Sequence, residues 1–208
     1  MPATQNPTTG YLEEAPAIVA ATTHAHEIGV PAIPVSVGST LRLLARAVAA
    51  THVVELGTGA GVATLWLLEG MAPEGTLTTI DSEAEHHRLA KEAVAASGHA
   101  AARTRFITGR AREVLPRLAD GAYDLVWCAE GVPEYADYLT AAVRLVRPGG
   151  LVVFNQAVGR AADPAARDGQ SVALRQLREQ LIEDARLLPA VLPGAEGVVA
   201  ALRLPDGG

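Results

Sequence analysis

Three glycines at alternate positions directly follow an apolar segment, and this arrangement limits the possible folds of the chain more than any other feature. Residues 53–56 favour a strand, Gly57, Gly59 and Gly61 come next, and residues 62–71 favour a helix. Glycine reaches the positive φ angles that a sharp turn requires, and without a side chain it lets a ligand approach the backbone closely. The segment therefore predicts a strand, a glycine turn and a helix that together bind a nucleotide-like ligand.

Strand-like and helix-like segments alternate along most of the chain. Strands are expected at residues 52–56, 76–81, 105–108, 123–128 and 151–155, and helices at residues 62–71, 83–97, 110–118, 134–145 and 170–185. Because the strand segments are apolar and alternate with helices, they predict a parallel sheet that helices cover on both faces. The predicted fold class is therefore α/β.

The N-terminal part of the chain lies outside this alternation. Residues 1–11 predict a disordered tail. Helices are expected at residues 12–28 and 39–50, the second of them capped by Gly38 or Ser39.

The C-terminal part also differs. The strand-like runs 187–192 and 198–204 flank a turn that contains proline and glycine, which predicts an antiparallel hairpin. We therefore expect a single domain over residues 12–208, made of N-terminal helices (12–51) and a Rossmann-like core (52–208).

Composition argues against several functional classes. The chain has 208 residues, of which 49% are apolar, so it can bury the core of one domain. Its net charge of −6 argues against nucleic-acid and anionic membrane partners. The single cysteine, Cys128, cannot form an internal disulfide and is expected in the core. With no apolar run of about 18 residues and no secretion signal, the sequence predicts a cytoplasmic protein.

Two ligand classes compete for the glycine turn. Dinucleotide sites show G-x-G-x-x-G, whereas this chain has G-x-G-x-G with Glu55 two residues before the first glycine. Asp81, at the end of the second predicted strand, can accept hydrogen bonds from the ribose hydroxyls of a dinucleotide or of S-adenosylmethionine. The C-terminal hairpin favours S-adenosylmethionine, because nucleotide dehydrogenases usually continue with parallel strands.

The two acidic residues have alternative roles that the sequence leaves open. Glu55 is expected to hold the glycine turn by accepting backbone N–H groups near the amino end of the cofactor, with helix capping as the alternative. For Asp81 the alternative is the N-cap of the helix that begins near Glu83.

Six short stretches together match one family: residues 54–61, 65–68, 77–81, 109–116, 123–126 and 147–150. From about residue 33 to residue 204 the chain resembles class I S-adenosylmethionine-dependent methyltransferases. The likeness is closer to the small O-methyltransferases of the catechol and caffeoyl-CoA type, and closest to those assigned by sequence in mycobacteria and related actinobacteria. This resemblance implies a three-layer Rossmann-like fold with a seven-stranded, mostly parallel sheet and an antiparallel C-terminal strand. It also implies a homodimer, which the apolar N-terminal helices favour.

The resemblance also implies where the cofactor lies. The methionine portion would lie over the glycine turn, the ribose on Asp81, the adenine near Gly109, and the amino-acid end along residues 35–38. The expected cofactor-binding residues are Val35, Glu55, Gly57, Thr58, Gly59, Gly61, Asp81, Ser82, Gly109, Arg110, Ala111 and Ala129. Two family positions differ, because Ala63 replaces a serine and Arg110 replaces an aspartate that accepts from the adenine amino group. Arginine has no acceptor, but it can stack on the ring.

The family's metal site is changed more strongly. Metal-dependent members hold Mg²⁺ with two aspartates and an asparagine, whose positions here are Ala129, Asn155 and Gln156, and their basic lysine is replaced by Val132. Because Mg²⁺ prefers charged oxygen ligands, the sequence predicts no metal site. Glu130 is the only carboxylate near the lost metal position, and it is the one catalytic candidate, with a solvated loop carboxylate as the alternative.

The remaining side chains of interest have simpler expected roles. His24, His26, His86 and His87 are expected on the surface, Trp127 in the core or the substrate pocket, and Asp163 in a loop (159–169) that covers the acceptor.

The sequence as a whole predicts an S-adenosylmethionine-dependent O-methyltransferase that acts on a small molecule without Mg²⁺. Two alternatives stay open: a catalytically silent S-adenosylmethionine-binding or regulatory protein of the same fold, and a nucleotide-binding oxidoreductase.

Overall fold

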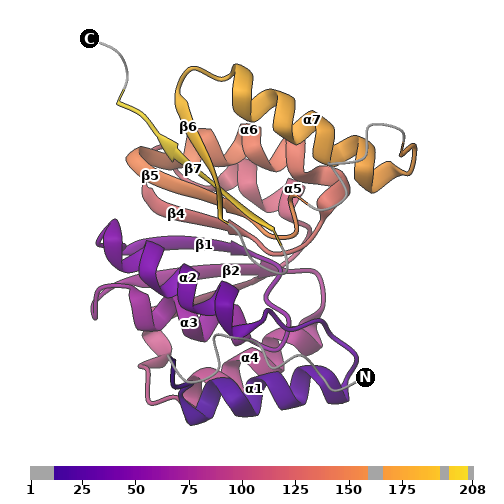
Figure 1. The fold of residues 1–208 in the computed structure, drawn as a ribbon. Coiled ribbons are helices and arrows are strands. Elements are labelled where there is room, and N and C mark those ends of the chain that lie inside the picture. The colour runs from indigo at the N-terminus through magenta and orange to yellow at the C-terminus, as the bar shows by residue number, and fades with distance from the viewer. Residues whose placement is uncertain (1–11, 159–165, 193–196, 206–208) are drawn as a thin grey trace.

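A computed structural model of the chain describes residues 12–158, 166–192 and 197–205. Within these residues, seven strands form one sheet in the order β3-β2-β1-β4-β5-β7-β6 (Figure 1). The strands are β1 (His52–Leu56), β2 (Thr76–Asp81), β3 (Thr104–Thr108), β4 (Tyr123–Cys128), β5 (Val146–Phe154), β6 (Leu187–Leu192) and β7 (Val198–Arg203). Strands β1 to β5 are parallel to one another, and β7 is antiparallel to both β5 and β6. The predicted sheet with an antiparallel last strand is thus confirmed.

Helices cover both faces of the sheet. They are α1 (Pro16–Glu27), α2 (Val35–Ala47), α3 (Val62–Gly70), α4 (Ala84–Ala96), α5 (Ala111–Val114), α6 (Tyr135–Leu145) and α7 (Gly169–Glu183), with single 3₁₀ turns at Ala101–Arg103, Leu115–Arg117 and Val132–Glu134. Figure 1 shows α1 to α4 on one side of the sheet and α5 to α7 on the other. No helix in the described ranges is long and apolar enough to cross a membrane.

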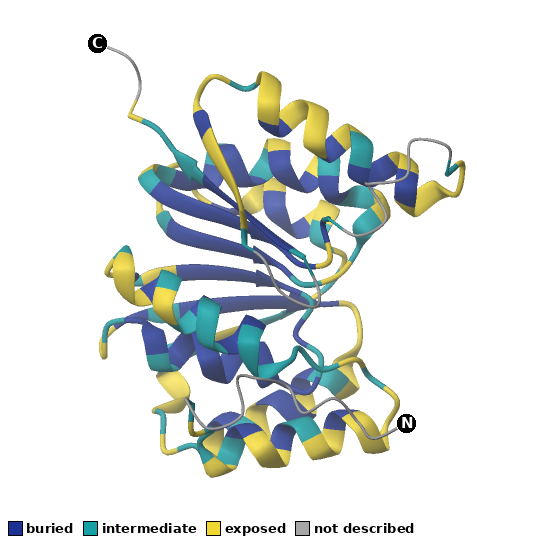
Figure 2. Ribbon diagram, in the orientation of Figure 1, coloured by how far each residue is buried: buried dark blue, intermediate teal, exposed yellow. Residues whose placement is uncertain are grey.

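The apolar core consists of two layers, one on each face of the sheet. Successive residues of β4 contribute to opposite layers. Trp127 packs between the sheet and helices α2 and α3, and Cys128 packs between the sheet and helices α6 and α7. Both side chains are fully buried, so Cys128 is a core residue as predicted and Trp127 takes the core alternative. Figure 2 shows the buried strands between helices whose outer faces are exposed.

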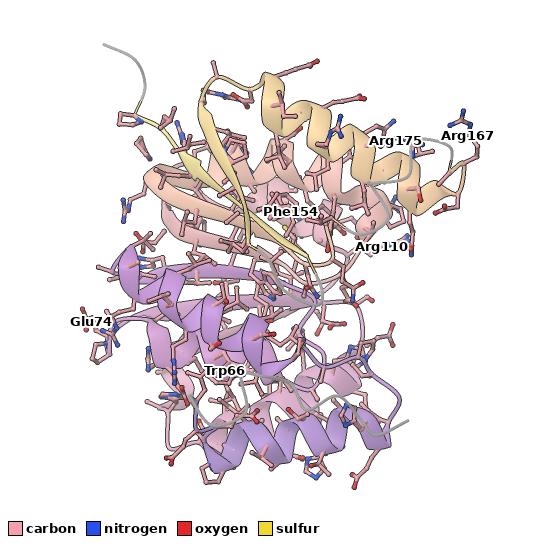
Figure 3. All side chains as sticks on the ribbon, in the orientation of Figure 1. Trp66, Glu74, Arg110, Phe154, Arg167 and Arg175 are labelled. Atoms are coloured by element: carbon pink, nitrogen blue, oxygen red, sulfur yellow. The ribbon has the colours of Figure 1, made fainter. Side chains whose placement is uncertain are left out.

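Helix α2 begins four residues before its predicted start. Its N-cap is Pro34, and Gly38 lies inside the helix and does not cap it. A β-carbon at Gly38 would lie 2.2 Å from Nε1 of Trp66, so this glycine lets the indole ring of α3 pack against α2 (Figure 3). Close helix packing explains a glycine that the sequence alone assigns to a helix end.

The segment predicted as one helix at 110–118 is also different. It forms only the short α5, followed by a 3₁₀ turn that contains Pro116. Proline lacks the N–H group that continues an α-helix, which accounts for the change. The predicted tail at residues 1–11 and Asp163 lie outside the described residues.

Candidate functional site

The glycine turn leaves the carboxyl end of β1 in the predicted conformation. Gly57, Gly59 and Gly61 have φ angles of 89°, 51° and 88°, all in the left-handed region that favours glycine. The turn is held by Gly57 N, which donates to the Ile80 carbonyl at 2.9 Å, and by Gly61 N, which donates to the Thr58 carbonyl at 3.0 Å.

Asp81 organises this turn from the end of the neighbouring strand β2. Its Oδ2 accepts the backbone N–H groups of Thr58 at 2.9 Å and Gly59 at 3.2 Å, and its Oδ1 accepts the backbone N–H of Glu83 at 2.9 Å. Burial raises the pKa of Asp81, but these hydrogen bonds and His86 outweigh it, so the pKa lies below its usual 3.8. A carboxylate has about four acceptor sites, so Oδ1 keeps one for a ligand hydroxyl.

Glu55 does not hold the glycine turn, which corrects the sequence-based expectation. The backbone N–H groups near it bind Asp81, whereas Oε2 of Glu55 accepts the Thr64 hydroxyl at 2.6 Å. Its Oε1 is buried and has no hydrogen-bond partner among the described residues. Burial raises the pKa of this side chain from 4.5 to about 8, so it is mostly neutral at pH 7. The reason for the difference is geometric, because the Glu55 side chain points into the protein interior, where it is fully buried.

Two of the four histidines predicted on the surface have structural roles. Nδ1 of His86 lies 3.0 Å from Oδ2 of Asp81, and His87 is 3% exposed and packs edge-on against Phe106. The prediction failed because it considered only helix α4, whereas the partners lie on β2 and β3. His24 and His26 are exposed, as predicted.

Two cavities meet above the glycine turn. The first cavity, of about 290 Å³, is lined by Val30, Pro31, Ala32, Ile33, Pro34, Gly57, Thr58, Gly59, Ala60, Val62, Ala63, Ala129, Glu130, Gly131, Val132, Pro133, Asn155, Gln156 and Gln170. The second cavity, of about 310 Å³, is lined by Leu56, Gly57, Ile80, Asp81, Ser82, Gly109, Arg110, Ala111, Glu130, Gly131, Glu134 and Tyr138. They share Gly57, Glu130 and Gly131, so these residues mark the junction between the cavities.

Most of the predicted cofactor-binding residues line one of these cavities. Arg110 lies at the rim of the second cavity, on the side of α5 (Figure 3). Three predicted residues do not line either cavity: Val35, Glu55 and Gly61. A β-carbon at Gly61 would lie 2.9 Å from the Cα of Ala90, so this glycine allows α3 and α4 to pack.

The sequence missed the segment 30–34, which lines the first cavity in place of the expected residues 35–38. This extended segment lies over the turn, since a β-carbon at Gly59 would lie 3.3 Å from Cγ1 of Val30. The two prolines at 31 and 34 indicate an extended conformation, but no local pattern shows that it folds back over the site.

Glu130 occupies the junction itself. A β-carbon at Gly57 would lie 2.5 Å from Cγ and 3.0 Å from Oε1 of Glu130. Although the residue as a whole is exposed, partial burial and then the charge of Asp81 raise the pKa of its carboxyl.

The three residues that the family resemblance aligns with metal ligands, Ala129, Asn155 and Gln156, all line the first cavity. Nδ2 of Asn155 donates to the Ala129 carbonyl at 3.4 Å, and its Oδ1 is buried without a partner in the described parts of the chain. Gln156 is exposed, with a positive φ of 50°. In the described ranges, no group of three or more His, Cys, Asp or Glu residues is arranged to hold a metal ion. Two neutral amides beside an alanine fit a hard divalent cation poorly.

Comparisons with known proteins agree with this geometry. Residues 8–204 match a family model described as O-methyltransferase. A Mycobacterium avium protein classed as an O-methyltransferase is 48% identical over 89% of this chain and 85% of its own. A Mycobacterium tuberculosis protein named "Probable O-methyltransferase" is 47% identical over 93% of this chain and 88% of its own.

Two solved structures have nearly the same fold. A Corynebacterium glutamicum protein superposes with a TM-score of 0.90 at 29% identity, over 97% of this chain and 95% of that one. The O-methyltransferase TomG of Streptomyces achromogenes, involved in tomaymycin synthesis and solved with S-adenosylmethionine, gives a TM-score of 0.88 at 28% identity, over 95% and 94%.

Proposed function

The chain belongs to the family of S-adenosylmethionine-dependent O-methyltransferases, and from this premise we propose that it methylates an oxygen of a small molecule without bound Mg²⁺. The observation that supports this most strongly is the pair of cavities that meet at the glycine turn, one lined by Asp81 and the other by the positions of the lost metal ligands. When bound, the cofactor supplies an electrophilic methyl group on a sulfonium.

The residues at the turn suit an adenosyl amino acid. We place its adenosine end in the second cavity, where Arg110 can stack on the adenine and the remaining acceptor site of Asp81 can bind a ribose hydroxyl. The glycines and other small residues around the turn let the ligand approach the backbone closely.

Absence of Mg²⁺ from the reaction is part of the proposal, and its support is the donor set. Only neutral amides and an alanine stand where the metal-dependent relatives have two carboxylates and an asparagine. Methyl transfer needs chiefly an aligned acceptor and removal of its proton, which a protein side chain can provide.

Turnover of labelled S-adenosylmethionine over a panel of phenols and carboxylates, with EDTA and separately with Mg²⁺, tests this function. We expect the same rate in both buffers. A rate that requires Mg²⁺ would contradict the metal-free reaction. Tight cofactor binding with no turnover across the panel would favour a catalytically silent binding protein instead.

Glu55→Gln is expected to change the pH dependence of stability. The folded-state pKa of Glu55, about 8, lies above the usual 4.5. Its contribution to the free energy of unfolding is therefore fully present below pH 4.5 and is lost as the pH rises to about 8. Glutamine cannot ionise, so at pH 9 the ligand-free variant should be more stable than wild type by about 1–3 kcal/mol. Urea denaturation from pH 5 to pH 9 measures this, with Glu74→Gln, at the exposed edge labelled in Figure 3, as the control. Parallel pH profiles for Glu55→Gln and wild type would contradict it.

We also propose that the protein is a homodimer. Family likeness supports this, as do four large apolar side chains that are more than half exposed in the described part of the chain: Leu43 (67%), Ile182 (68%), Leu188 (58%) and Val191 (59%). Sedimentation velocity should give about twice the chain mass of 21.6 kDa. A species of the single-chain mass at micromolar concentration would contradict it.

A further inference from the structure

The junction between the two cavities is where the reacting atoms must meet. If the adenosine end occupies the second cavity and the acceptor enters the first, the sulfonium methyl lies near the residues that both cavities share. These are Gly57, Glu130 and Gly131. Glu130 alone among them has a side chain that can exchange a proton.

The other carboxylates of the two cavities are already engaged. Asp81 accepts three backbone N–H groups, and Oε2 of Glu134 accepts the hydroxyl of Tyr138. Glu130 has no hydrogen-bond or ion-pair partner among the residues that the structure describes. A carboxylate at the junction of the two cavities, with no partner in the described part of the chain, is available to a ligand.

The groups around Glu130 also favour proton transfer. Its neighbours Ala129 and Gly131 are small, and Val132 stands where relatives carry a basic lysine, so no amine competes at that position. The charges that act on Glu130 are those of Asp81 and Glu83, which disfavour its ionised form, and of His86, which favours it. When the sulfonium near Glu130 loses its positive charge on methyl transfer, the affinity of this carboxylate for a proton increases.

We propose that Glu130 is the catalytic base of this protein, accepting the hydroxyl proton of the acceptor as the sulfonium methyl passes to the acceptor oxygen. This inference rests on the proposed function. The O–H bond breaks as its proton binds a carboxylate oxygen of Glu130, and an oxygen electron pair forms the new O–CH₃ bond. The electrons of the broken S–CH₃ bond stay on sulfur. One positive and one negative charge are lost together, leaving a neutral methyl ether, neutral S-adenosylhomocysteine and protonated Glu130.

Acceptor acidity provides the first test, with Glu130→Gln compared with wild type and with Glu113→Gln. The control removes the same charge from an exposed position on α5. The probes are 4-methylphenol and 4-nitrophenol, which are similar in size, but the second ionises near neutral pH without help. Glu130→Gln should lower kcat/KM about 10²- to 10⁴-fold for 4-methylphenol and less than about tenfold for 4-nitrophenol. Equal losses for the two phenols, or no loss, would overturn the assignment.

Cofactor affinity provides a second test that needs no acceptor. Because Glu130 faces a sulfonium in the wild-type complex, Glu130→Gln should weaken binding of S-adenosylmethionine roughly three- to tenfold and leave that of S-adenosylhomocysteine unchanged. An unchanged ratio of the two dissociation constants would contradict the placement of Glu130 beside the methyl group. If wild type bound neither compound, the proposed function itself would fail, so the two failures can be told apart.

Discussion

Replacing Asp81 by asparagine is expected to weaken binding of S-adenosylmethionine more than about 100-fold and to lower the free energy of unfolding by about 3 kcal/mol. The buried carboxylate accepts the backbone N–H groups of Thr58, Gly59 and Glu83. In asparagine an NH₂ group replaces one of the two acceptor oxygens, so the side chain cannot accept all three of these N–H groups. The glycine turn would therefore lose its shape, and the cofactor would lose the carboxylate that we propose binds its ribose. Titration calorimetry and urea denaturation at pH 7 measure the two effects.

The pH dependence of the same variant gives a further check. Because hydrogen bonds hold the pKa of Asp81 below its usual 3.8, its contribution to stability is present above about pH 4 and is lost as pH falls through the folded-state value. The stability difference between wild type and Asp81→Asn should shrink in acid. Glu83→Gln, two residues away and exposed, keeps the backbone donor and serves as the control. A variant at position 81 that binds the cofactor as well as this control does would count against the account of the turn.

Gly61→Ala is expected to lower the free energy of unfolding by about 3 kcal/mol. Of this, about 1–2 kcal/mol comes from the left-handed φ of 88°. The rest comes from the contact of the new β-carbon with the backbone of Ala90 at 2.9 Å, which α4 cannot relieve by a side-chain rotation. Urea denaturation measures the change.

The chain offers a matched control for this effect. Gly98 has a similar φ of 79°, but no atom lies within 4 Å of its would-be β-carbon, so Gly98→Ala should show the backbone strain alone, about 1 kcal/mol. Equal destabilisation of the two variants would mean that helix packing at Gly61 is unimportant.

Local sequence signals predicted the sheet well. The bounds of β1, β2, β4 and β6 match the predicted strands, because each apolar run ends at a glycine, an acidic residue or a turn. The glycine turn and the antiparallel C-terminal hairpin followed from the same kind of short-range evidence, whereas the seven-stranded sheet with an antiparallel last strand followed from the family resemblance. Ser82, Gly109, Arg110 and Ala111, which the family resemblance assigns to the cofactor, all line the second cavity.

Features that depend on contacts between distant segments could not be predicted in this way. Asp81, and not Glu55, holds the glycine turn. The oxygens of Asp81, at the end of β2, face backbone N–H groups of the turn that follows the neighbouring strand β1. Residues 30–34 line the first cavity because the N-terminal helices pack back onto α3 and α4. His86 reaches the same carboxylate from α4. In each case the partner lies on another helix, strand or loop, and local periodicity and turn signals do not show which distant segments come into contact.

Titration calorimetry of the purified protein with S-adenosylmethionine tests the central claim most directly. The account predicts one site per chain, a dissociation constant in the micromolar range, and loss of the signal in Asp81→Asn. No measurable heat for either S-adenosylmethionine or S-adenosylhomocysteine, or saturable binding of NAD(H) in their place, would contradict it.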